Sequence, residues 1–99
     1  MNQIIPLTGG SLNAHQRFEV QLGDNLTTMI LNWRTLIEQW SLDIEVEGVR
    51  IVNGAILLPG SDIIEVWQTN LGRLVVNGDT PTLDNLGTNN RLVWVSPNV

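Results

Sequence analysis

Apolar and polar residues alternate most strictly in the second half of the segment Leu26–Val46. One side of this half carries Trp40, Leu42, Ile44 and Val46, and the other side carries Ser41, Asp43, Glu45 and Glu47. Successive side chains of a strand point to opposite faces, so a period of two indicates a strand. We therefore predict a strand with one packed face and one face that meets water or a partner.

The first half of the segment fits two structures. Its apolar residues fall on one helical stripe, formed by Leu26, Met29, Ile30, Trp33, Leu36, Ile37 and Trp40. However, Thr27, Thr28, Ile30 and Trp33 are residue types that favour strands. Met29, Leu31 and Trp33 also alternate as they would in a strand that turns into the Trp40 strand. Periodicity favours a helix here, whereas residue type favours a hairpin.

Shorter segments of the chain also predict strands. These are Gln3–Leu7, Arg17–Leu22 with Phe18, Val20 and Leu22 on its apolar face, Val49–Val52, Ala55–Leu58, Asp62–Thr69, Arg73–Val76, and Arg91–Val95 with Leu92 and Trp94 on its apolar face. Asn53–Gly54 predicts a two-residue hairpin turn between two of them. Pro81 and Thr82 predict one helical turn over Leu83–Leu86, ended by a left-handed Gly87. The pattern indicates a mainly β fold, a small antiparallel barrel or sandwich of seven to nine short strands with at most one short helical turn.

Length and composition limit the function further. The chain has 99 residues, which we expect to form a single β domain over residues 1–99, and it contains no cysteine. Five arginines, no lysine and ten acidic residues give a net charge of −5. Because nucleic-acid binding needs clustered cations, we expect no direct binding of nucleic acid. No segment resembles a signal peptide or a membrane span, so we expect a soluble protein without membrane contact.

Candidate catalytic groups are few. His15 has Ser11 as its nearest hydroxyl in the sequence, and no cysteine is present. Asp43, Glu45 and Glu47 would lie roughly 6 to 7 Å apart along one strand face, a spacing found between glycosidase carboxylates. A chain of this size leaves little room for a sugar cleft, so an acidic stripe is the simpler interpretation. We expect no enzyme activity.

The sequence evidence for a metal site or a nucleotide site is equally weak. Asp79 and Asp84 lack the spacing of a calcium loop, and the glycines form no phosphate-binding motif. We therefore expect no metal and no cofactor. Four tryptophans form a large aromatic group for so short a chain, and most of them are expected in the core. Trp67 is a candidate for an interface, where tryptophan is enriched.

Five segments together resemble the baseplate plug proteins of contractile-tailed phages, the cyanophage-type plug family. They are IIPL at Ile4–Leu7, RFEVQL at Arg17–Leu22, LNWR and QWSLDI within Leu31–Ile44, LPGSDII at Leu58–Ile64 and PTLDNLGTNNRLVWV at Pro81–Val95. The resemblance covers most of the chain and selects the hairpin for the contested segment. It implies a structural virion protein that plugs the baseplate axis between the spike-bearing hub and the tail tube until genome ejection.

The resemblance also implies partners. These are the hub and tail tube proteins and further copies of the chain in a three-fold or six-fold arrangement, in the virion tail after synthesis in the host cytoplasm. The candidate interface comprises Trp67, as an aromatic anchor, and six charged residues placed by strand parity, which are Arg34, Asp43, Glu45, Glu47, Arg50 and Arg73. The competing interpretation is a free-standing β-barrel binding module that holds a sugar or a peptide against Trp33 or Trp67.

Overall fold

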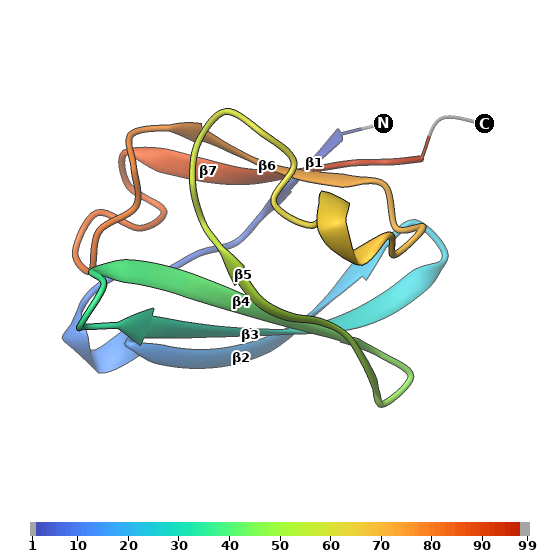
Figure 1. Cartoon of the computed structure of the whole chain (residues 1–99), viewed down its shortest axis with the longest axis horizontal. Helices are drawn as coiled ribbons and strands as arrows, with labels where there is room; N and C mark the ends of the chain where they lie inside the picture. The colour runs from blue at the N-terminus through green and yellow to red at the C-terminus, as the bar shows by residue number, and fades with distance from the viewer. Residues whose placement is uncertain (1, 98–99) are drawn as a thin grey trace.

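The computed structural model describes residues 2–97, which form seven strands and two short 3-10 turns (Figure 1). The strands are β1 (Asn2–Ile5), β2 (His15–Leu22), β3 (Asn25–Arg34), β4 (Gln39–Val46), β5 (Val49–Ile56), β6 (Arg73–Gly78) and β7 (Asn90–Val95). The 3-10 turns are η1 (Ser11–Asn13) and η2 (Glu65–Trp67). The prediction of a mainly β fold is confirmed.

The strands form two antiparallel sheets that face each other. The order is β2-β3-β4-β5 in the four-stranded sheet and β1-β7-β6 in the three-stranded sheet. Figure 1 shows the two layers one above the other, and they do not close into a barrel. Of the two predicted architectures, the sandwich is therefore the one observed. β1 ends before Pro6 and lies at a sheet edge, where a residue without an N–H is tolerated.

The segment Leu26–Val46 forms the β3–β4 hairpin at the centre of the larger sheet. Leu31 pairs with Leu42 and Trp33 pairs with Trp40 across the hairpin. The helical alternative is wrong, and the choice made from the resemblance is confirmed. The helical stripe wrongly indicated a helix because two of its apolar residues, Leu36 and Ile37, lie exposed in the turn and contribute nothing to the core.

The core lies between the sheets and is built from their alternating inner faces. Trp40, Leu42 and Ile44 of β4 are fully buried, as are Leu74 of β6 and Leu92 of β7. The predicted inner faces of β2, β4 and β7 are thus confirmed, with Phe18 and Val20 packed against the core from its border. Such burial is the main favourable contribution to folding.

Two buried tryptophans also fix loops to the core through their indole N–H groups. Trp40 Nε1 donates to the Thr82 carbonyl oxygen at 2.8 Å, and Trp94 Nε1 donates to the Leu71 carbonyl oxygen at 2.7 Å. A buried indole usually needs such an acceptor. The loop before β6 and the loop after it are both held to the core in this way.

The predicted hairpin turn at Asn53–Gly54 is wrong. Both residues lie inside β5, a single strand that pairs with β4 and whose register shifts at this point. The bulge allows Val52 and Ala55 to pack on the same inner face, opposite Ile44 and Leu42. Gly54 supplies the positive φ of +87° that the sequence pattern indicated, but it bends a strand instead of reversing it.

The predicted strand at Asp62–Thr69 is also wrong. Asp62 makes only an isolated bridge to Val75, and the chain then enters η2. One carboxylate oxygen of Asp62 accepts the backbone N–H groups of Ile64 and Leu74, each at 3.1 Å. Because a side chain occupies these donors, the segment turns locally instead of continuing along the sheet.

The helical turn predicted over Leu83–Leu86 is replaced by consecutive hydrogen-bonded turns. Thr82 N–H donates to the Asn85 side chain at 2.6 Å, and Asn85 N–H donates to the Thr82 hydroxyl at 3.2 Å. These reciprocal bonds close the loop without a helix. Leu86 is buried, and Gly87 has the predicted positive φ, at +81°.

The polar outer face of the four-stranded sheet

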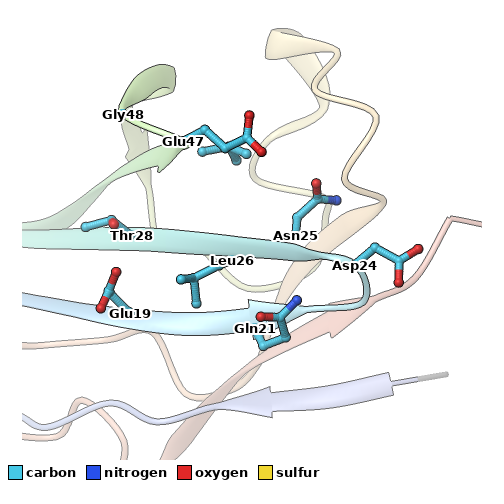
Figure 2. A pocket seen from close by; sticks show the side chains of 9 residues that line it. Glu19, Gln21, Asp24, Asn25, Leu26, Thr28, Glu47 and Gly48 are labelled. Atoms are coloured by element: carbon cyan, nitrogen blue, oxygen red, sulfur yellow. The ribbon is translucent and has the colours of Figure 1, made fainter.

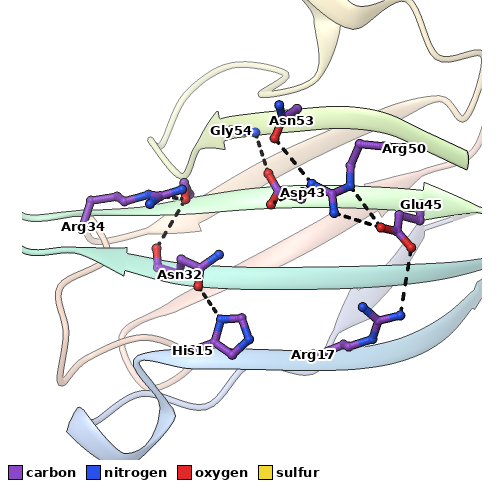
Figure 3. A network of polar contacts seen from close by, with 10 residues as sticks. His15, Arg17, Asn32, Arg34, Asp43, Glu45, Arg50, Asn53 and Gly54 are labelled. Atoms are coloured by element: carbon purple, nitrogen blue, oxygen red, sulfur yellow. Dashed lines mark hydrogen bonds and ion pairs between the residues drawn. The ribbon is translucent and has the colours of Figure 1, made fainter.

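The outer face of the four-stranded sheet carries an array of polar side chains, which we call the polar face (Figure 3). It consists of His15, Arg17, Asn32, Arg34, Ser41, Asp43, Glu45, Arg50 and Asn53. The period of two in β4 places Ser41, Asp43 and Glu45 on this face, because Trp40, Leu42 and Ile44 occupy the inner one.

Asp43 is the most enclosed acid of the polar face, with 8% of the residue exposed. Its Oδ1 accepts the backbone N–H of Gly54 at 2.7 Å, and its Oδ2 lies 3.2 Å from Nη1 of Arg50. The β5 bulge therefore has a direct link to a charged residue of β4. Asp43 satisfies a backbone donor that the register shift would otherwise leave unpaired.

Arg50 joins the two acids of β4. Its Nε and Nη2 donate to Oε2 of Glu45 at 3.1 and 2.9 Å, which is a forked, charge-assisted contact. Arg17 of β2 approaches the other Glu45 oxygen at 4.0 Å. Two arginines thus face two carboxylates, and the centre of the polar face is close to electrically neutral.

Contacts to uncharged side chains extend the array toward the η1 end. Arg34 Nε donates to the Ser41 hydroxyl at 2.9 Å, and Nδ1 of His15 contacts the side-chain oxygen of Asn32. Among residues 2–97, the side chain that is hydrogen-bonded to the His15 ring is thus an amide and not a nucleophile. The arrangement therefore offers no acid, base and nucleophile in series.

At the opposite end, the polar face runs into an acidic recess of about 310 Å³ (Figure 2). Its lining includes Glu19, Asp24 and Glu47, which come from β2, the β2–β3 turn and the β4–β5 turn. Within residues 2–97, none of these three acids forms an ion pair. The negative charge of this surface is therefore concentrated at its end rather than at its centre.

The seven residues of the predicted interface do not form one surface. Arg34, Asp43, Glu45 and Arg50 share the polar face, and Glu47 lines the acidic recess. Trp67 lies in η2, half-buried against the core. Arg73 belongs to β6 of the other sheet, where it alternates with the buried Leu74 and so points outward. The alternation of apolar and polar residues correctly predicted which side chains point outward from a strand. It contained no information on which of the two sheets that strand joins.

Two kinds of residue escaped the sequence prediction. Arg17 is part of the charged array, and its alternation with the apolar Phe18 was the signal that placed it on the outer face. Leu12, Leu36 and Ile37 are exposed apolar residues in loops. These residues could have been noticed in the sequence because they are apolar in segments where polar turn residues are usual.

The described residues, 2–97, contain no group of three or more potential ligands that would hold a metal ion. Nor does this part of the chain contain a helix long and apolar enough to cross a membrane. Asp43 and Glu45 do not line the acidic recess, and both are engaged by Arg50.

Comparison with known protein families gives one match. The family described as "Cyanophage baseplate Pam3 plug gp18" matches residues 2–97. No significant match to a curated protein was found. The matched range includes every strand of both sheets and therefore the whole sandwich, not one motif. The chain belongs to the cyanophage baseplate plug family.

Proposed function

We propose that this protein closes the axis of a phage tail baseplate, between the spike-bearing hub and the tail tube, until the genome is ejected. Membership of the plug family gives it a structural role in the baseplate of the virion tail and contacts with other baseplate components. The match over residues 2–97 is the observation that carries the proposal, because the whole sandwich is covered.

The charge of the chain supports a position on the DNA path. A net charge of −5 without any lysine keeps the surface from binding phosphate. Two of the five arginines, Arg17 and Arg50, are already engaged by carboxylates of the same chain. A stopper of this kind blocks the channel without holding the DNA that must later pass.

The proposal includes the mode of assembly. Residues 1–99 act as one domain, synthesised in the host cytoplasm and built into the tail as three or six copies around the axis, since such symmetry suits a tail. The contacts to hub and tube involve Arg34, Asp43, Glu45 and Arg50 of the polar face, Glu47 of the acidic recess, Trp67 of η2 and Arg73 of β6. No catalytic step is required of the protein.

Co-expression with the proteins encoded beside it in the phage genome tests this function. Each pair is purified through a tag on the neighbour, and its mass is measured by native mass spectrometry. A complex of defined stoichiometry with a hub or tube protein is expected. Wild-type protein that remains a monomer and binds none of these neighbours would contradict the proposal.

A further inference from the structure

Three loops meet at one end of the sandwich, at the left in Figure 1. The η1 loop is joined to β3 by a hydrogen bond from Trp33 N–H to the Ala14 carbonyl, at 2.7 Å. It is joined to the loop before β7 by a bond from Gly10 N–H to the Leu83 carbonyl, at 2.6 Å. The β3–β4 turn, which holds Leu36 and Ile37, lies at the same end.

Apolar side chains protrude from these loops. Leu36 is 100% exposed, Leu12 is 97% exposed and Ile37 is 55% exposed. Together with the partly buried Trp33 and Leu83, they form what we call the apolar end. Tight turns normally use Gly, Asn, Asp or Pro, so local stability does not explain leucine and isoleucine here. Exposed apolar residues that break a local rule mark an interaction site.

A recess of about 290 Å³ lies within the apolar end. Trp33 and Leu83 supply its apolar lining, and Thr82, Glu38 and Asp84 complete it. Glu38 and Asp84 are exposed, and neither forms an ion pair within the described residues. The recess thus combines an aromatic wall with two carboxylates that form no ion pair within the described residues. This contrasts with the polar face, whose central acids are already paired.

The two carboxylates of the apolar end indicate what kind of partner binds there. In a two-fold contact between copies, the carboxylates of the apolar end would face the same carboxylates, which is unfavourable. In a ring of three or six copies a different surface of the next copy would meet the apolar end, and that copy could offer only arginines, of which Arg17 and Arg50 are already paired with its own acids. An anionic lipid surface would repel the same acids. A protein segment with an apolar side chain flanked by Lys or Arg matches both the apolar lining and the acidic rim.

We infer that the apolar end is the surface by which this protein docks onto a neighbouring baseplate protein, through an apolar segment of that partner bordered by Lys or Arg. The inference rests on the proposed function, which supplies the neighbour. Leu36 and Ile37 enter the partner surface, and the partner's apolar side chain covers Trp33 and Leu83. Glu38 and Asp84 pair with its cations, so the complex weakens as salt is added.

The test uses the complex formed by the full chain and the neighbour that co-purifies with it. The dissociation constant is measured for wild type and Leu36→Asn, with Ile4→Asn as the matched control. Ile4 is 59% exposed but belongs to β1, outside the three loops. We expect Leu36→Asn to weaken binding roughly tenfold or more, as at an interface hot spot, and Ile4→Asn to leave it unchanged.

A charge variant gives a second, independent measurement. The double substitution Glu38→Lys, Asp84→Lys should weaken binding at least as strongly and abolish its decrease with added salt. Thermal melting of each variant checks the fold, which should be intact because all the altered side chains are exposed. If Leu36→Asn failed to fold, the charge variant alone would decide.

The outcomes separate the two proposals. If wild type binds its neighbour and both variants bind equally well, the docking surface is wrong while the proposed function stands. If wild type binds no neighbour, the proposed function fails and the docking surface fails with it. Leu36-dependent self-association, or Leu36-dependent flotation with phosphatidylglycerol vesicles, would also overturn the choice of partner.

Discussion

Asp43 shows how a residue of a predicted exposed stripe becomes part of the fold. The sequence places it on the outer face with Glu45, and both do lie there. Its carboxylate nevertheless spans β4 and β5, because the bulge at Gly54 presents a backbone N–H at 2.7 Å and Arg50 covers the other oxygen. An alternating pattern predicts the face of a side chain but not the register shift of its neighbour.

Replacing Asp43 should therefore affect stability. We expect Asp43→Ala to lower the free energy of unfolding by about 1 to 3 kcal/mol, because the Gly54 N–H loses its acceptor. Asp43→Asn should lose less, since the amide oxygen still accepts that bond. Urea unfolding followed by tryptophan fluorescence measures both variants. Asp24→Asn, in an exposed turn, is the control, and a loss equal to that of Asp43→Ala would contradict this account.

At the scale of elements, the sequence predicted those strands whose alternation is uninterrupted. β2, β4 and β7 were found from their apolar faces, and the β3–β4 hairpin required the family resemblance. The hairpin turn predicted at Asn53–Gly54 was wrong because a glycine with positive φ is found in a β-bulge as well as in a hairpin turn. The segment after Asp62 was predicted wrongly because its carboxylate accepts a local hydrogen bond from Ile64 N–H, which turns the chain, and a tertiary one from Leu74 N–H, which the local pattern does not contain. The polar face crosses four strands, so predicting it would have required the order in which they pair.

Two glycines with positive φ give a matched test of the strand elements. Gly54, at +87°, has open space where a Cβ would lie, whereas a Cβ on Gly72, at +106°, would clash with the Val95 carbonyl oxygen. We expect Gly54→Ala to cost about 1 to 2 kcal/mol of unfolding free energy through backbone strain alone. Gly72→Ala should cost roughly 2 kcal/mol more, because backbone atoms must move. Equal losses in chemical denaturation would argue against this packing of β6 and β7.

At the scale of the whole molecule, both sheets contribute to one core. Trp40 of the larger sheet and Trp94 of the smaller one are buried, and each indole bonds to a loop beside the smaller sheet. The sequence predicted the apolar residues of this core, but neither the division of the strands into two sheets nor the strand order. Those depend on contacts between segments far apart in the chain.

A shared core predicts cooperative unfolding of the whole chain. Tryptophan fluorescence and far-ultraviolet circular dichroism should report the same midpoint and the same slope in urea, because neither sheet keeps its buried face without the other. The measurement also tests the proposal that residues 1–99 act as one domain. Two separate transitions would mean that the sheets unfold independently.

Electron cryomicroscopy of the intact phage, before and after tail contraction, tests the central claim most directly. The account predicts density for this sandwich on the tail axis, between hub and tube, in the extended tail, with the apolar end seated on a neighbouring protein. After contraction, that axial density should be gone. An axis closed by a different chain, or this sandwich at the periphery of the baseplate, would contradict the account.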